Sequence, residues 1–151
     1  MRVALALILT VSAAQAEPQP AVAELMHYME GLPACLERVG DAAALEDCAG
    51  RFATLCMDSE EGGYSTIGMT FCMLAENEAW DRLLNAEYRQ AMEGARDMDA
   101  DEAELFPEFA NRAETLRDAQ RAWIAFRDAE CALAYAKWGS GSMRQTAGAA
   151  C

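Results

Sequence analysis

Apolar side chains recur every three or four positions along most of the chain. The two clearest stripes run through residues 69–98 and 107–138. Side chains three and four apart share one face of a helix, so both segments are predicted to be long amphipathic helices. Thr70 is a candidate cap for the first. Its stripe consists of Met69, Cys72, Met73, Trp80, Leu83, Leu84, Tyr88 and Met92.

The second stripe is expected to face the core as well. Its inward side chains are predicted to be Phe109, Ala113, Leu116, Trp123, Phe126 and Ala134. The acidic segment 97–108 is expected to link the two helices. The glycine- and serine-rich residues 139–151 are expected to form a closing loop.

Shorter helical segments precede the long ones. Helical spacing over residues 22–29 is interrupted at Gly31–Pro33, and a short helix is expected to resume up to Val39. The alanine-rich residues 42–57 predict another helix, with Asp41 as its N-cap. No segment alternates convincingly as a strand would. The predicted fold is therefore all-α, a small helical bundle built on two long antiparallel helices.

The first sixteen residues have the pattern of a secretory signal peptide. Arg2 is followed by an apolar run and by the small-residue ending Ala14-Gln15-Ala16, which predicts cleavage after Ala16. The apolar run is too short to span a bilayer. We therefore expect a periplasmic or secreted protein with no membrane insertion after cleavage.

Secretion gives the six cysteines a structural meaning. An even number of cysteines in an oxidising compartment indicates a disulfide framework, although six cysteines allow fifteen pairings. Pairing of sequence neighbours is preferred, because each bridge would close a loop of about 15 to 20 residues and contribute on the order of 3 kcal/mol. The preferred pairs are Cys35–Cys48, Cys56–Cys72 and Cys131–Cys151.

The chain is strongly acidic, with a formal net charge of −13 that loss of Arg2 would change to −14. The acidic residues are spread along the helical segments, as on an ordinary solvated surface. They would also attract a cationic partner. No basic patch is present, so nucleic acid and anionic lipid are disfavoured as partners.

Residue patterns typical of enzymes are missing. His27 is the single histidine, no serine lies in a G-x-S-x-G elbow, and the cysteines are better explained as bridges than as nucleophiles. The lack of a C-x-x-C pair also argues against zinc. We expect no enzymatic activity and no cofactor, and we assign no catalytic, cofactor-binding or metal-ligating residue.

Polar side chains at helical spacing also lie on both long segments. Three on the first and four on the second fall on one face of each helix. A partly buried arginine needs a carboxylate partner, so these side chains are predicted to form a structural network, with Asn85 and Gln120 hydrogen-bonded across the helix interface. The set is Asp81, Asn85, Tyr88, Gln120, Trp123, Arg127 and Glu130.

These helices carry a family resemblance. "CMLAENEAWDRLLNAEYRQAM" followed by "LRDAQRAWIAFRDAEC" resembles the N-terminal domain of LprI-type lysozyme inhibitors, long catalogued as a domain of unknown function in bacterial envelope proteins. The glycine-serine segment 139–142 and Cys151 fit the same pattern. The matching positions are Cys72, Glu76, Asp81, Leu84, Asn85 and Tyr88 in the first half, and Leu116, Gln120, Trp123, Arg127, Asp128 and Cys131 in the second.

The resemblance spans residues 56–151 and implies a disulfide-stapled helical domain. Residues 17–55 are expected to be an N-terminal helical extension outside the shared pattern. The implied function is inhibition of lysozyme. The expected partner is a c-type lysozyme, a cationic enzyme that would attract the acidic protein and whose cleft it would block. The alternative is a periplasmic structural or interaction module with another protein partner and no lysozyme inhibition.

A loop between two bridged cysteines is the candidate binding element. The segment "KWGSGSMR" would lie between Cys131 and Cys151 and would offer hydroxyl and cationic groups to a cleft lined by catalytic carboxylates. Its proposed partner-binding residues are Lys137, Ser140, Ser142 and Arg144.

Overall fold

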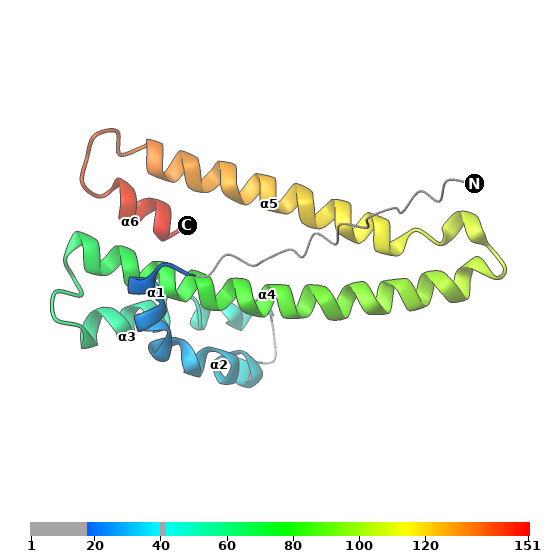
Figure 1. The fold of residues 1–151 in the computed structure, drawn as a ribbon, viewed down its shortest axis with the longest axis horizontal. Coiled ribbons are helices and arrows are strands. Elements are labelled where there is room, and N and C mark those ends of the chain that lie inside the picture. Colours follow the sequence, from blue (N-terminus) through cyan, green and yellow to red (C-terminus); the bar gives the residue numbers. More distant parts are fainter. Residues whose placement is uncertain (1–17, 40–41) are drawn as a thin grey trace, which may run out of the picture.

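The computed structural model describes residues 18–39 and 42–151, in which every regular element is helical (Figure 1). This confirms the predicted all-α class. Two long helices, α4 (Thr66–Ala103) and α5 (Arg112–Ala136), lie side by side as an antiparallel hairpin along the long axis of the molecule. The predicted signal peptide and its cleavage point after Ala16 lie outside the described residues.

Helix α4 begins earlier and ends later than its apolar stripe predicts. Its N-cap is Ser65, whose hydroxyl accepts the backbone N–H of Gly68 at 3.0 Å. The prediction that Thr70 caps the helix is wrong, because Thr70 lies inside the helix and donates to the carbonyl of Thr66 at 2.7 Å. The predicted acidic linker 97–108 is also shorter than expected, since the helix continues to Ala103.

Helix α5 starts at Arg112 and not at Pro107. Pro107–Phe109 instead form a single 3₁₀ turn, η3. The prediction that Phe109, Trp123 and Phe126 face the core is wrong, since these side chains are 59%, 43% and 66% exposed. No residue of α5 is buried, because the helix packs against α4 and α6 along one narrow face. Half-buried residues mark that face: Ala113, Leu116, Gln120, Arg127, Cys131 and Ala134.

The core lies where the short N-terminal helices cover the first half of α4. These are α1 (Pro20–Leu25), the 3₁₀ helix η1 (Met26–Gly31), α2 (Leu32–Val39), the 3₁₀ helix η2 (Ala42–Asp47) and α3 (Arg51–Ser59). The predicted continuous helix over residues 42–57 is wrong, and its predicted N-cap, Asp41, lies outside the described residues. Gly50 separates η2 from α3 with a φ of +76°, a backbone conformation that only glycine adopts without strain.

Three disulfides join these parts, and all three predicted pairs are confirmed. Cys35–Cys48 ties α2 to the turn after η2, and Cys56–Cys72 ties α3 to α4. Cys131–Cys151 ties α5 to the residue that follows α6 (Arg144–Ala149). Residues 139–151 were predicted to form an irregular loop. This prediction is wrong for the second half of the segment, because α6 is helical. Cys48, Cys56 and Cys72 are at most 1% exposed, so two bridges form part of the core.

Candidate functional site

The loop between α5 and α6 is ordered by its own hydrogen bonds. The N–H of Gly139 donates to the carbonyl of Ala136 at 3.0 Å, and the N–H of Gly141 donates to the carbonyl of Trp138 at 2.8 Å. Gly139 has a φ of +52°, so the turn requires glycine. These bonds fold the segment back on itself, so that it projects as a compact turn at one end of the molecule (Figure 1).

The four residues predicted to bind a partner lie in or beside this turn. Lys137, Ser140 and Ser142 are exposed. Arg144 is half-buried as the first residue of α6, with its guanidinium 5.4 Å from the ring centroid of Tyr135. The hydroxyls of the two serines and the ammonium group of Lys137 are therefore open to solvent, whereas the Arg144 guanidinium lies against the Tyr135 ring.

Helix α6 anchors the far side of the loop on α4. Thr146 is only 3% exposed, and its hydroxyl lies 3.0 Å from that of Thr70 and 3.3 Å from the carbonyl of Thr66. The side-chain amide of Asn77 donates to the carbonyl of Ala149 at 2.7 Å. With the Cys131–Cys151 bridge, these contacts fix both ends of the loop. The loop is thus preorganised, which lowers the entropy cost of binding.

Four of the seven residues of the predicted polar network lie together between α4 and α5. The Arg127 guanidinium is 3.9 Å from a carboxylate oxygen of Asp81 and lies over the Trp123 ring at 5.3 Å. Asn85 donates to Asp81 on its own helix at 2.8 Å, where a bond to Gln120 was expected. Arg127 also binds its neighbour Asp128 at 2.8 Å. The arginine is 38% exposed, so these ion pairs contribute little, about 1 kcal/mol or less.

The other three predicted members are not brought into this cluster. Tyr88 and Gln120 are half-buried, Glu130 is exposed, and the described contacts join none of them to the opposite long helix by a hydrogen bond or ion pair. The role of the whole set as a structural network stays a prediction.

A long groove of about 1030 Å³ runs beside this cluster. It is bounded by α1, α3, α4, α5 and α6 and reaches Cys151. Trp80 and Trp123 supply aromatic walls, while Asp81 and Arg127 lie along its edge. The groove thus adjoins the end of the molecule from which the α5–α6 loop projects.

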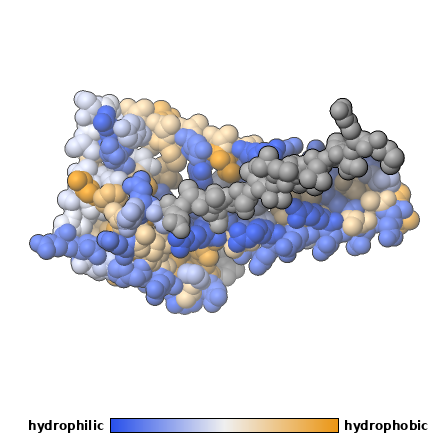
Figure 2. Space-filling view, in the orientation of Figure 1, coloured by the Kyte–Doolittle hydropathy of each residue, from blue (hydrophilic) through white to orange (hydrophobic). Residues whose placement is uncertain are grey.

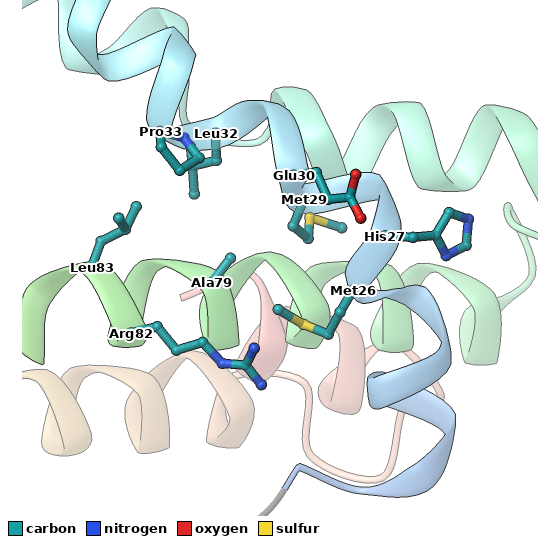
Figure 3. Close-up of a pocket in the computed structure, with 9 residues that line it drawn as sticks. All are labelled: Met26, His27, Met29, Glu30, Leu32, Pro33, Ala79, Arg82 and Leu83. Carbon is teal, nitrogen blue, oxygen red and sulfur yellow. The ribbon is translucent and has the colours of Figure 1, made fainter. Parts of the chain in front are cut away.

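A smaller pocket of about 370 Å³ lies between η1, α2 and α4 (Figure 3). Its wall is apolar, with Met29, Leu32 and Ala79 all buried. Of the polar side chains in its lining, Arg82 pairs with Glu78 at 2.8 Å and the His27 ring binds the carbonyl of Glu24 at 2.8 Å. The third, Glu30, is exposed. The pocket offers an apolar hollow without a set of polar groups that converges on a ligand.

Glu76 is a buried carboxylate that the sequence analysis gave no structural role. It is 4% exposed and receives the backbone N–H of Gly50 at 2.6 Å, that of Ala53 at 2.5 Å, and the indole N–H of Trp80 at 3.1 Å. Two of these donors are unpaired N–H groups at the start of α3, so Glu76 caps that helix from α4. The carboxylate therefore holds the start of α3 against α4.

Asp99 caps the start of α5 from α4 in a similar way, at the other end of the hairpin. Its carboxylate accepts the backbone N–H groups of Arg112 and Ala113, both at 2.9 Å, and lies 3.4 Å from the Arg112 guanidinium. Glu102 binds the same guanidinium at 2.6 Å. The hydrogen bond from the backbone N–H of Ala113 is the main cause that lowers the pKa of Asp99 below its ordinary 3.8. The backbone and side chain of Arg112 lower this pKa further, whereas desolvation of the carboxylate opposes the shift.

This lowered pKa predicts a pH-dependent effect of Asp99→Asn. A lowered folded-state pKa contributes stability above the ordinary value of 3.8, and that contribution is lost as pH falls through the folded-state pKa. Asp99→Asn should therefore lower the urea midpoint at pH 7, and its deficit should shrink as the pH falls below 3.8. The exposed neighbour Asp97, changed to Asn, serves as the control and should have little effect. A deficit for Asp99→Asn that is independent of pH would refute this account.

Other site classes receive no support from the described residues. Over 18–39 and 42–151, no group of three or more His, Cys, Asp or Glu side chains is placed to hold a metal ion. Within the same ranges, no helix is both long and apolar enough to cross a membrane. The α5–α6 loop, with its exposed cationic and hydroxyl groups, and the neighbouring groove form the candidate binding surface.

Comparison with known proteins adds a family to this geometry. Residues 56–151 match the family described as "Lysozyme inhibitor LprI". A curated relative, an uncharacterized protein of Rhizobium meliloti (strain 1021), is 33% identical over 79 residues. That alignment covers 52% of this chain and 57% of the relative, so the chain spans a little over half the relative's length. No solved structure matches.

Proposed function

The chain belongs to the LprI lysozyme-inhibitor family, and we propose on this basis that it binds a basic lysozyme and blocks its cleft with the α5–α6 loop. The family match over residues 56–151 carries the proposal. An inhibitor-like function follows from that membership, and the family description is of an enzyme inhibitor and not of an enzyme. Three disulfides are typical of proteins that fold outside the reducing cytoplasm. We place the protein in the periplasm or the secreted fraction.

The distribution of charge suits both the long-range approach to a basic enzyme and the direct contact with its cleft. The overall charge of −13 would steer the protein toward a strongly basic enzyme over distances up to the Debye length. The α5–α6 loop carries positive charge instead, since Lys137 and Arg144 lie at its two ends. A glycosidase cleft contains a pair of catalytic carboxylates, so a loop with two cations and two serine hydroxyls fits its chemistry.

Reversing the loop charges should weaken binding strongly. Lys137→Glu combined with Arg144→Glu should raise the Kd for hen lysozyme at least about tenfold, because two attractive groups then repel the cleft carboxylates. Isothermal titration calorimetry at physiological salt measures this Kd directly.

A matched control separates the loop from the overall charge. Arg117→Glu combined with Arg121→Glu makes the same change in net charge on the exposed part of α5, away from the loop. This control should change the Kd only slightly. Equal losses in both double variants would mean that net charge, and not the loop, governs binding.

A further inference from the structure

We infer that the tip of the α4–α5 hairpin is a second docking surface, built to bind a basic partner protein that presents an apolar patch. The tip comprises residues 97–109, which include the end of α4, the turn and η3. It lies at the end of the molecule opposite the α5–α6 loop (Figure 1). The proposed function uses the α5–α6 loop and assigns no role to this surface, which is therefore an addition to it.

Large apolar side chains at the tip are left open to solvent. Leu105 is 76% exposed, Phe109 59%, Met98 53% and Phe106 50%. The two phenylalanine rings lie together, with centroids 6.4 Å apart. In Figure 2 hydrophobic surface is visible at this end of the hairpin, beside strongly hydrophilic surface. Isolated exposed apolar residues are ordinary, but four within twelve positions form a patch of the kind that marks an interaction site.

The patch is held in place and not carried on a loose loop. Asp99 binds the first two backbone N–H groups of α5, and Glu102 binds the Arg112 guanidinium, so α4 and α5 are fastened together directly behind the turn. Within the turn, the N–H of Phe106 donates to the carbonyl of Glu102 at 2.8 Å, and the N–H of Phe109 donates to the carbonyl of Phe106 at 3.0 Å. Aromatic side chains held on a fixed backbone lose little entropy on binding, which is typical of interface anchors.

The charge around the patch identifies the occupant as basic. Residues 97–109 contain six acidic side chains and no basic one. Asp99 and Glu102 are paired with Arg112, whereas the remaining four are exposed around the apolar group: Asp97, Asp101, Glu104 and Glu108. This rim would repel an anionic membrane surface and a second copy of the same tip. It would attract a surface where lysine or arginine surrounds apolar side chains.

The two ends of the protein are too far apart for one small contact surface. The 38 residues of α4 extend over about 57 Å, with the α5–α6 loop near the first residues and the tip at the last. A partner at the tip therefore leaves the loop free, and the protein can bind two proteins at once.

A synthetic helical peptide with one lysine face and one leucine face is the probe that tests this surface. Its fluorescein-labelled form is titrated with the oxidised full protein, and fluorescence anisotropy gives the Kd. Two tip variants are compared with the unmodified protein: Leu105→Ser/Phe106→Ser/Phe109→Ser, and a neutralised rim. The second consists of Asp97→Asn, Asp101→Asn, Glu104→Gln and Glu108→Gln.

Each tip variant has a control away from the tip, and the control for the rim is matched in charge. Phe126→Ser removes an aromatic that is 66% exposed on α5. A charge-matched control neutralises four exposed carboxylates elsewhere: Glu37, Glu46, Glu87 and Glu93, each changed to Gln. The tip variants should raise the Kd at least tenfold and the controls less than twofold. Circular dichroism melting curves verify that every variant is folded.

Three results would overturn the inference. The first is that the unmodified protein does not bind the peptide measurably, or that the tip variants bind it with the same Kd as the unmodified protein. The second is an equal loss in the control variants. The third is tip-dependent binding to phosphatidylcholine vesicles in place of the peptide, which would make the tip a membrane anchor. None of these assays contains lysozyme, so their outcome and that of the lysozyme proposal are independent.

Discussion

Replacing Glu76 by alanine is expected to lower the free energy of unfolding by about 3 kcal/mol. The carboxylate is 4% exposed and accepts three hydrogen bonds, from the N–H groups of Gly50, Ala53 and Trp80. Alanine would leave the buried N–H of Ala53 and the part-buried N–H of Gly50 without their carboxylate acceptor. Urea denaturation of the oxidised protein measures the loss.

Two companion variants make the Glu76 prediction specific. Glu76→Gln keeps one acceptor oxygen and should fall between the wild type and Glu76→Ala. Glu78→Ala, two residues away, removes a partly exposed carboxylate that pairs with Arg82 one helical turn along, and should cost only about 0.5 kcal/mol. If Glu76→Ala were no more destabilising than Glu78→Ala, Glu76 would not hold α3 in place.

Opening the Cys131–Cys151 bridge should affect both stability and partner binding. The bridge closes a segment with a sequence separation of 20, so Cys131→Ser with Cys151→Ser should cost about 3 kcal/mol of unfolding free energy. The loop would then be held at its far end by non-covalent contacts of α6, such as the Thr146–Thr70 hydroxyl pair and the Arg144–Tyr135 contact. The Kd for hen lysozyme should rise at least about tenfold as preorganisation is lost.

The bridge at the other side of the core provides the control. Cys35→Ser with Cys48→Ser opens a segment with a sequence separation of 13 and should cost a similar free energy. It lies among the N-terminal helices, away from the loop, so lysozyme affinity should remain close to that of the wild type. Equal losses of affinity in both variants would show that global stability, and not the loop, limits binding.

Much of the fold could be predicted from the sequence because its signals are local. The 3.6-residue stripes identified α4 and α5. The even cysteine count in a chain with a secretory leader pattern indicated a disulfide framework, and the preference for short closed loops selected the neighbour pairs. The boundaries were harder, because tertiary contacts set them. Asp99 holds the start of α5 from a distance of 13 positions in sequence, which no local pattern around Arg112 reveals. Helix α6 likewise depends on burial of Thr146 against α4, in a segment whose glycines favour a loop.

The exposed face of α5 shows a second limit of prediction from sequence, which concerns burial. Trp123 and Phe126 are large and apolar, so periodicity assigned them to the core, yet α5 packs mainly against α4 and α6 and leaves both side chains exposed. The sequence does not reveal how many neighbours a helix has. Glu76, in contrast, was detectable: it lies four residues from both Cys72 and Trp80, on the inward stripe, and a carboxylate in that position requires buried donors.

The most direct test of the central claim is a lysis assay. Hen lysozyme is added to a suspension of Gram-positive cell walls, with and without the purified oxidised protein, and the fall in turbidity is followed. Lysis should slow as the protein approaches the concentration of the enzyme, and the variant Lys137→Glu/Arg144→Glu should be a much weaker inhibitor. Undiminished lysis at a large molar excess of the wild-type protein would contradict it.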